Sequence, residues 1–141
     1  MAGYILDTSS LLTLIEGEAG ATRVEEVLRT EKVFISWVAL LELRYVNEQR
    51  RGVDEADMRH LLVTNLKADI LWNADEPLLL TAARFKAAHR ISLGDSIISA
   101  SAHRLDATLL HKDREFESLA GLIKLESLPY KRQAAHSGRP A

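Results

Sequence analysis

The sequence predicts an α/β fold in which a mostly parallel sheet is covered by helices on both faces. Short apolar runs alternate with helical segments five times along the chain, which is typical of repeated βαβ units. The chain has 141 residues, of which 47% are hydrophobic, and this suits one domain with a full core. We therefore expect a single domain over residues 1–128.

The first elements follow from changes in residue type. The apolar run at residues 3–6 predicts a strand, and the Asp-Thr-Ser-Ser that follows it favours the start of a helix over residues 8–15. Two glycines mark the next turn. Apolar positions at helical spacing then predict a helix over residues 22–30, and the compact apolar run at 33–35 predicts the second strand.

The middle of the chain continues the same alternation. Ser36 is a typical N-cap and begins a predicted helix that runs to Arg51, where Gly52 ends it. A further helix is expected over residues 54–67, and residues 69–72 predict the third strand.

The last elements complete the predicted sheet. A helix with a proline in its first turn is expected over residues 75–88, and another over residues 92–105. Residues 108–110 predict the fourth strand, residues 113–119 a short helix, and residues 122–126 the fifth strand.

Residues 129–141 differ from the rest of the chain. They are polar from Tyr130 onward and carry basic side chains at Lys131, Arg132 and Arg139. This composition predicts a disordered C-terminal tail. The alternative is that its cations contact phosphate.

The composition excludes several classes of function. The chain has no cysteine, which excludes disulfide scaffolds, thiolate zinc sites and cysteine nucleophiles. It has no glycine-rich nucleotide-binding motif and no i,i+4 pair among its five histidines. We expect a cytoplasmic protein with no membrane partner, because no segment resembles a membrane span or a signal peptide. The net charge of −2, taken by itself, gives no sign of a nucleic-acid partner.

Two aspartates follow predicted strands. Asp7 comes directly after residues 3–6, and Asp113 comes shortly after residues 108–110. Ligands of open parallel sheets bind beyond the C-terminal ends of the strands, near the point where the strand order reverses. If these two strands are neighbours, both carboxylates lie at one edge of the sheet. The alternative is that each aspartate only caps the helix that follows it.

Two further acids are predicted to point inward from helices. Asp95 lies three residues after Ser92, in the first turn of a helix with a small and mostly apolar face. Glu42 lies within an apolar stripe, with Val38 and Val46 one turn away on either side. Because burial of an unpaired carboxylate is costly, Glu42 needs either a salt bridge to an arginine or a metal ion.

Taken together, the four acids favour a metal site over four separate caps. Asp7, Glu42, Asp95 and Asp113 would raise one another's pKa unless a divalent cation compensated their charge. Carboxylate ligands without cysteine or paired histidine indicate Mg²⁺ or Mn²⁺. Some basic side chains could contact phosphate around this site, or could be ordinary solvated charges: Arg44, Arg50, Arg51, Lys112 and Arg114.

Four segments of the chain resemble the PIN-domain nucleases. The segments are YILDTSSLL (residues 4–12), SWVALLELRY (36–45), ISLGDSIISASA (91–102) and TLLHKDREF (108–116). Their order and spacing over about residues 3–128 are most similar to the VapC toxins of bacterial and archaeal toxin–antitoxin pairs.

This resemblance implies a three-layer α/β/α domain whose five-stranded parallel sheet has the order 3-2-1-4-5. It also implies a metal-dependent endoribonuclease that uses Mg²⁺ or Mn²⁺ to cut RNA, a small antitoxin protein that covers the acidic groove, and a homodimer. The family's acidic quartet is matched by Asp7, Glu42, Asp95 and Asp113. Glu115 matches an extra acid that some members have.

One position departs from the family pattern. The family often has Thr or Ser two residues before its last acid, and here that residue is His111. Its imidazole can still donate one hydrogen bond and accept another. The alternative is that His111 is a strand-end residue that faces solvent.

These observations give a hypothesis for the chemistry. Asp7, Asp95 and Asp113 hold the metal ion, and Glu42 orients or deprotonates the attacking water. Because water is the nucleophile, the products carry 5′-phosphate and 3′-hydroxyl ends. Two alternatives are a non-catalytic PIN-like module that binds a partner protein, and a PIN nuclease that acts in RNA processing or on DNA.

Overall fold

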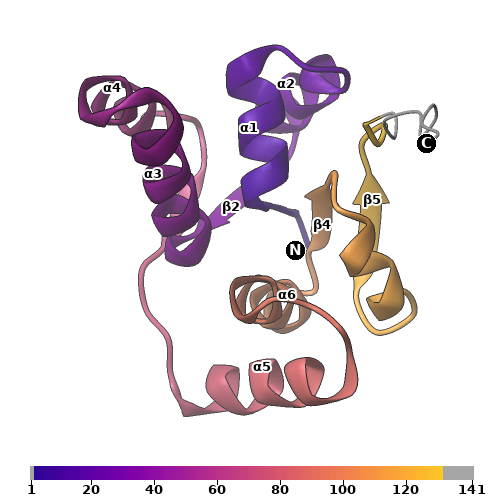
Figure 1. Ribbon diagram of the computed structural model, residues 1–141. Helices are drawn as coiled ribbons and strands as arrows, with labels where there is room; N and C mark the ends of the chain where they lie inside the picture. Colours follow the sequence, from indigo (N-terminus) through magenta and orange to yellow (C-terminus); the bar gives the residue numbers. More distant parts are fainter. Residues whose placement is uncertain (1, 132–141) are drawn as a thin grey trace, which may run out of the picture.

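The computed structural model of the protein describes residues 2–131 and contains a five-stranded parallel sheet (Figure 1). Every pair of neighbouring strands is parallel. The strand order β3-β2-β1-β4-β5 confirms the predicted topology. The strands are β1 (Tyr4–Leu6), β2 (Val33–Ser36), β3 (Asp69–Leu71), β4 (Thr108–His111) and β5 (Lys124–Ser127).

Helices cover both faces of this sheet. They are α1 (Thr8–Glu16), α2 (Ala21–Thr30), α3 (Trp37–Arg51), α4 (Val53–Thr64), α5 (Glu76–Ala88), α6 (Leu93–Leu105) and the 3₁₀ helix η1 (Arg114–Leu119). The chain runs from β1 towards β3 in one direction and then crosses to β4 on the other side of β1. Because parallel crossovers are right-handed, this reversal puts α1–α4 on one face and α5 and α6 on the other, as Figure 1 shows.

The core lies on both sides of the central strands. The side chains of Ile5, Leu6, Ile35, Leu109 and Leu110 are fully buried, although they alternate in direction along their strands. This explains why the strands have continuous apolar sequences, because both faces of a doubly covered sheet are removed from water.

Two predicted boundaries differ from the observed ones by more than one residue. The helix expected over residues 54–67 is α4, which ends at Thr64. The side chain of Asn65 donates to the carbonyl of Leu61, and the backbone N–H of Leu66 turns to the carbonyl of Val63, so the i→i−4 pattern stops. The last strand begins at Lys124 and not at residue 122. The backbone N–H groups of Leu122 and Ile123 donate to Leu119, so both residues belong to the turn after η1.

Two findings concern the remaining predictions about the whole chain. Among the described residues, no helix is long and apolar enough to cross a membrane. The predicted disordered tail spans residues 129–141, and residues 132–141 lie outside the described part of the chain.

Candidate active site

The predicted aspartates meet beside the point where the strand order reverses. Asp7 directly follows β1 and Asp113 lies two residues after β4. These two strands are neighbours, with Leu6 paired to Leu110. The strand pairing therefore places both aspartates at the same C-terminal edge of the sheet, which is where ligands of open parallel sheets bind.

Asp7 is both a helix cap and a member of the acidic site. Its side chain is 2% exposed and accepts a hydrogen bond from the backbone N–H of Ser10 at 2.9 Å, which caps α1. The hydroxyl of Ser9 lies 2.7 Å from each carboxylate oxygen. Burial raises the pKa of Asp7 to about 6, although these hydrogen bonds oppose the shift.

Asp95 is held at the start of α6 with its carboxylate turned towards the other acids. Ser92 caps the helix by accepting the backbone N–H of Asp95 at 3.1 Å. The side chain is 7% exposed, and its carboxylate accepts no hydrogen bond from any described residue. The pKa of Asp95 is raised to about 7. Burial is the largest cause, and repulsion from the other acids adds to it, first from Asp7 and Asp113 and then from Glu42 and Glu115.

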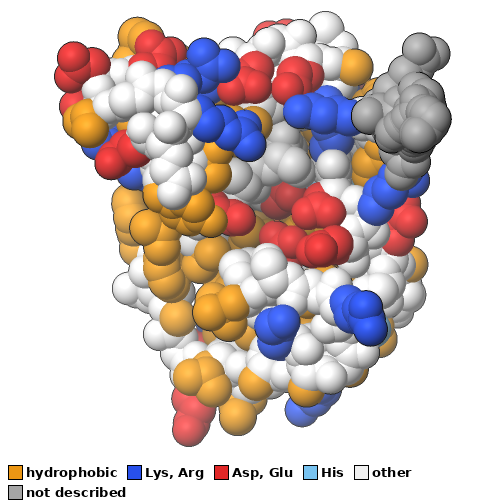
Figure 2. All heavy atoms as spheres, in the orientation of Figure 1, with side chains coloured by type: hydrophobic (Ala, Val, Ile, Leu, Met, Phe, Trp, Pro, Cys, Tyr) orange, Lys and Arg blue, Asp and Glu red, His pale blue; other side chains and the backbone are white. Residues whose placement is uncertain are grey.

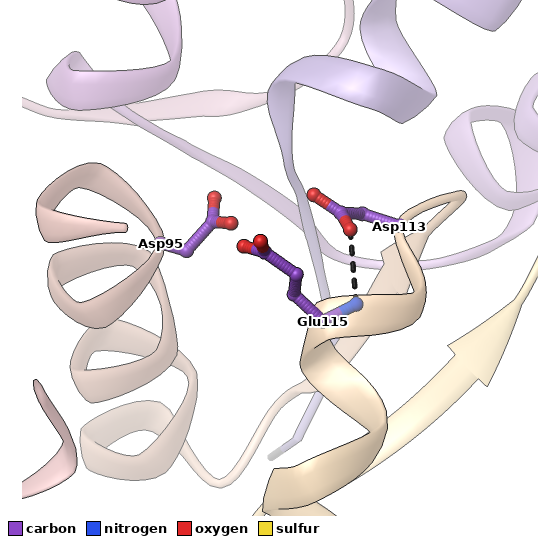
Figure 3. Close-up of side chains that lie close together, drawn as sticks. All are labelled: Asp95, Asp113 and Glu115. Carbon is purple, nitrogen blue, oxygen red and sulfur yellow. Dashed lines mark hydrogen bonds between the residues drawn. The ribbon is translucent and has the colours of Figure 1, made fainter. Parts of the chain in front are cut away.

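The most compact acidic group consists of Asp95, Asp113 and Glu115 (Figure 3). One carboxylate oxygen from each of them lies within 4.8 Å of the other two. Asp113 caps η1 by accepting the backbone N–H of Glu115 at 2.9 Å, which fixes the two residues relative to each other. We expected Asp7 in this group, whereas the structure puts Glu115 there and places Asp7 beside it.

Glu42 lies next to this cluster on α3, half-buried and with a hydrogen-bond donor. Its Oε1 accepts from the hydroxyl of Thr8 at 2.7 Å, and no described arginine or lysine forms a salt bridge with it. The first turn of α6 approaches Glu42 at Gly94, where an added Cβ would lie 3.6 Å from Glu42 Oε1. Of the two alternatives for Glu42, the salt bridge to an arginine is not found among the described residues, and a hydroxyl donates to the carboxylate instead.

His111 does not face solvent, and that interpretation was wrong. Its side chain is 1% exposed and packs against the rings of Phe116 and Tyr130, with centroids 5.1 and 6.2 Å away. Its Nδ1 accepts the backbone N–H of Asp113 at 3.2 Å. Burial lowers the pKa of His111 and favours the neutral ring that this hydrogen bond requires. His111 thus shapes the loop that carries Asp113.

The donor set of the cluster fits a hard divalent cation. The ligand atoms available are carboxylate oxygens, which Mg²⁺ and Mn²⁺ prefer, and no sulfur or imidazole is among them. Burial raises the pKa of Asp7 and Asp95, and repulsion between the neighbouring carboxylates adds to the shift, as expected of acids whose compensating charge comes from outside the protein. Figure 2 shows the acidic side chains gathered in a hollow at the centre of this face, with Lys and Arg side chains around it.

A comparison with protein-family models gives one match, to the PIN domain, over residues 4–122. The chain belongs to the PIN domain family. This finding confirms the resemblance of the four sequence segments, all of which lie inside the matched region. The sequence matches none of the curated proteins with which it was compared.

Solved structures share this PIN fold at low sequence identity. VapBC2 from Rickettsia felis, bound to a promoter DNA fragment, gives a TM-score of 0.74 at 16% identity and covers 89% of this chain and 98% of its own. VapBC from Salmonella typhimurium, bound to DNA, gives 0.72 at 21% identity, with 90% and 98% covered. VapC20 from Mycobacterium tuberculosis, described as a sarcin-ricin loop cleaving toxin, gives 0.69 at 16% identity, with 84% and 95% covered.

Sequence reasoning missed three features of this PIN domain. Ser9 connects the segments that follow β1 and β4, because its hydroxyl oxygen also accepts the backbone N–H of Lys112 at 2.8 Å. The side chain of Lys112 is only 4% exposed. Tyr130 packs back onto η1, where its hydroxyl donates to Glu117 at 2.7 Å and its ring lies 4.1 Å from the guanidinium of Arg114. An aromatic residue inside a polar segment is the signal that could have revealed the last contact.

Proposed function

We propose that this PIN domain is a metal-dependent endoribonuclease and acts as the toxin of a toxin–antitoxin pair. The observation that carries the proposal is the group of three carboxylates, Asp95, Asp113 and Glu115, within 4.8 Å of one another at the ligand-binding edge of the sheet. Support for RNA as the substrate comes from the shared fold with VapC20, which is described as a toxin that cleaves the sarcin-ricin loop.

The residues of the cluster have distinct tasks in this proposal. Asp95, Asp113 and Glu115 would hold Mg²⁺ or Mn²⁺, and Asp7 adds a further negative charge from beside them. When bound, such an ion lowers the pKa of a coordinated water and neutralises charge that develops on the phosphate. Ser9 and Ser10 keep the Asp7 carboxylate in one orientation, and His111 does the same for the backbone of Asp113.

Glu42 is the residue best placed to handle the attacking water. Thr8 donates to its Oε1, which leaves Oε2 to accept a proton from water. The water oxygen attacks phosphorus, the bond to the 3′-oxygen breaks, and the leaving oxygen takes up a proton. Hydrolysis by water therefore gives 5′-phosphate and 3′-hydroxyl ends, and the 2′-hydroxyl of the RNA takes no part.

The partners of the proposed toxin follow from the solved neighbours. The Rickettsia and Salmonella structures are VapBC complexes, and a Klebsiella pneumoniae structure is a toxin–antitoxin complex. We accordingly propose an antitoxin protein that covers the acidic hollow, a homodimer of this chain, and the cytoplasm as the setting.

The proposal is tested by RNA cleavage together with metal binding. We expect the purified protein to cut RNA with Mg²⁺ or Mn²⁺, and we expect cleavage to stop in EDTA. The product ends should be joined by a ligase without prior phosphatase or kinase treatment. Products with a 2′,3′-cyclic phosphate would contradict hydrolysis by water. Calorimetry with Mn²⁺ that shows no binding above background would favour the non-catalytic interaction module instead.

A further inference from the structure

A second cavity opens directly beside the acidic cluster. It has a volume of about 410 Å³, and Asp113 belongs both to its wall and to the cluster. The wall is formed by α1 and the turn that follows it, the C-terminal end of α3, the loop between β4 and η1 with the start of η1, and the segment after β5. Its cationic side chains are Arg50, Lys112, Arg114 and Lys131.

Cations outweigh acids in this cavity. Its acids besides Asp113 are Glu16 and Glu18. Glu16 is already neutralised from outside the cavity, because Arg59 lies 3.0 Å and Arg51 3.3 Å from its Oε2, and these arginines lower its pKa. Apart from Asp113 of the acidic cluster, Glu18 is therefore the carboxylate that is left to balance the cations of the wall.

Glu18 lies between two of these cations. The ammonium of Lys112 is 3.5 Å from its Oε1, and that of Lys131 is 3.3 Å from its Oε2. The side chain of Lys112 lines the cavity and is almost fully buried, so packing fixes its position there. Arg50 and Arg114 form no ion pair with any described residue. The cavity thus keeps positive charge that one carboxylate does not neutralise.

The other side of the acidic site has the opposite character. A cavity of about 370 Å³ includes Glu42 in its wall and is otherwise lined mainly by apolar and aromatic residues such as Tyr45 and Leu93. No lysine or arginine lines it. The cavity on the Glu42 side therefore offers an RNA strand no cation, whereas the Lys112 cavity offers four.

We propose that the Lys112 cavity is an anion subsite that binds a backbone phosphate of the RNA strand next to the phosphate that is cut. Glu18 occupies the subsite when no RNA is present, and the phosphate displaces it. A phosphodiester carries the same charge as this carboxylate and can accept hydrogen bonds from Lys112 and Arg50 together. The proposal rests on the proposed function, because it takes RNA as the substrate.

Three substitutions test the subsite by moving RNA affinity in opposite directions. Fluorescence anisotropy with a short fluorescein-labelled single-stranded RNA, in EDTA, measures binding without cleavage. We expect Lys112→Met and Arg50→Gln each to weaken binding about tenfold and to reduce the slope of log K against log salt by about 0.7, as for one lost phosphate contact. Glu18→Gln should tighten binding several-fold, because the competing carboxylate is gone.

A matched control removes the same charge from a different face. Lys86→Met on α5 exchanges an exposed lysine on the other side of the sheet and should leave RNA affinity within about twofold. Thermal unfolding confirms that each variant is folded. Equal affinities for Lys112→Met and Lys86→Met, or weaker binding by Glu18→Gln, would overturn the subsite.

A cleavage assay separates this proposal from the proposed function. If the wild-type protein binds RNA in the expected pattern but never cuts it with Mg²⁺ or Mn²⁺, the nuclease proposal fails and the subsite stands. If Lys112→Met cuts RNA with an unchanged KM, the subsite fails and the nuclease proposal stands. A raised KM with a retained kcat supports both.

Discussion

Asp7 and Asp95 lie in the same acidic site, but the protein treats their charges differently. Asp7 is buried together with its hydrogen-bond donors, the hydroxyl of Ser9 and the backbone N–H of Ser10. Asp95 is nearly as buried, yet its carboxylate receives no donor from the described residues and faces other carboxylates. The fold therefore stabilises the charge of Asp7 in part and leaves that of Asp95 to a cation.

The difference indicates what each residue contributes. A carboxylate with local donors keeps its orientation whether or not a metal ion is bound, so Asp7 is a fixed wall of the site. A buried carboxylate without donors destabilises the metal-free fold and becomes favourable when a cation arrives. Asp95 thus couples metal binding to stability. This difference between Asp7 and Asp95 can be tested by removing the two charges one at a time.

The largest expected effect comes from comparing Asp95→Asn with Asp7→Asn. Both variants should lose RNA cleavage by about 10³-fold, because each removes a charge that balances the cation. Their metal-free stabilities should differ. Asp95→Asn removes a carboxylate with a pKa of about 7 and should gain on the order of 2 kcal/mol at pH 8, whereas Asp7→Asn should gain less, because one amide nitrogen must face the Ser9 hydroxyl.

Urea unfolding in EDTA at pH 8 measures this difference. Thr81→Ala, on the exposed part of α5 away from the acids, is a suitable reference for ordinary surface substitutions. If Asp95→Asn is less stable than the wild-type protein, the carboxylate of Asp95 is stabilised in the metal-free fold. That result would contradict the proposed difference between Asp95 and Asp7.

The pH dependence of the metal-free protein is the next expected effect. The pKa values of Asp7 and Asp95 in the fold, about 6 and about 7, lie above the unfolded value of 3.8, so the folded state binds more protons between these limits. The free energy of unfolding in EDTA should therefore fall by a few kcal/mol as pH rises from about 4 to about 7, and stay level above that range. Chemical denaturation at a series of pH values measures it.

Metal ions should remove this dependence. At pH 8 added Mn²⁺ should raise the stability of the wild-type protein, and at pH 5 it should add little, because protons occupy the carboxylates. The double variant Asp7→Asn, Asp95→Asn should lose this fall and keep only the rise in stability towards pH 6.5 that the lowered pKa of His111 predicts. A wild-type profile in EDTA that rises between pH 5 and pH 7 would contradict the raised pKa values.

The sequence predicted the fold well because the fold depends on patterns that repeat along the chain. Continuous apolar strands such as residues 33–35 report burial on both faces, and helix caps such as Ser36 and Ser92 report the boundaries. The start of the last strand was missed because the turn before it is held by backbone groups. Nothing in the residue types of Leu122 and Ile123 shows that their N–H groups bond to Leu119.

The site was predicted in outline and missed in detail. The positions of Asp7 and Asp113 follow from a general rule for parallel sheets, so periodicity was enough to find them. Glu115 could be placed only by resemblance, because its approach to Asp95 depends on the 3₁₀ turn that brings it round. His111 was misjudged because a strand end normally reaches solvent, and here Phe116 and Tyr130 cover it.

The smallest expected effect concerns His111, which supports one of the acids through the backbone. His111→Asn keeps an acceptor near the position of Nδ1, and His111→Leu fills similar space without one. Both lose the contacts with Phe116 and Tyr130, so both should lose stability. Only His111→Leu leaves the partly buried N–H of Asp113 without its acceptor, and it should bind Mn²⁺ about tenfold more weakly than His111→Asn.

Calorimetry with Mn²⁺ separates this positioning role from simple packing. A packing role would lower the stability of both variants and leave their Mn²⁺ affinities equal, which would contradict the prediction. His111→Thr restores the hydroxyl that the family often has at this position, so its affinity should return towards the wild-type value. Recovery by threonine but not by leucine would show that the acceptor for Asp113, and not the imidazole as such, keeps the cluster in place.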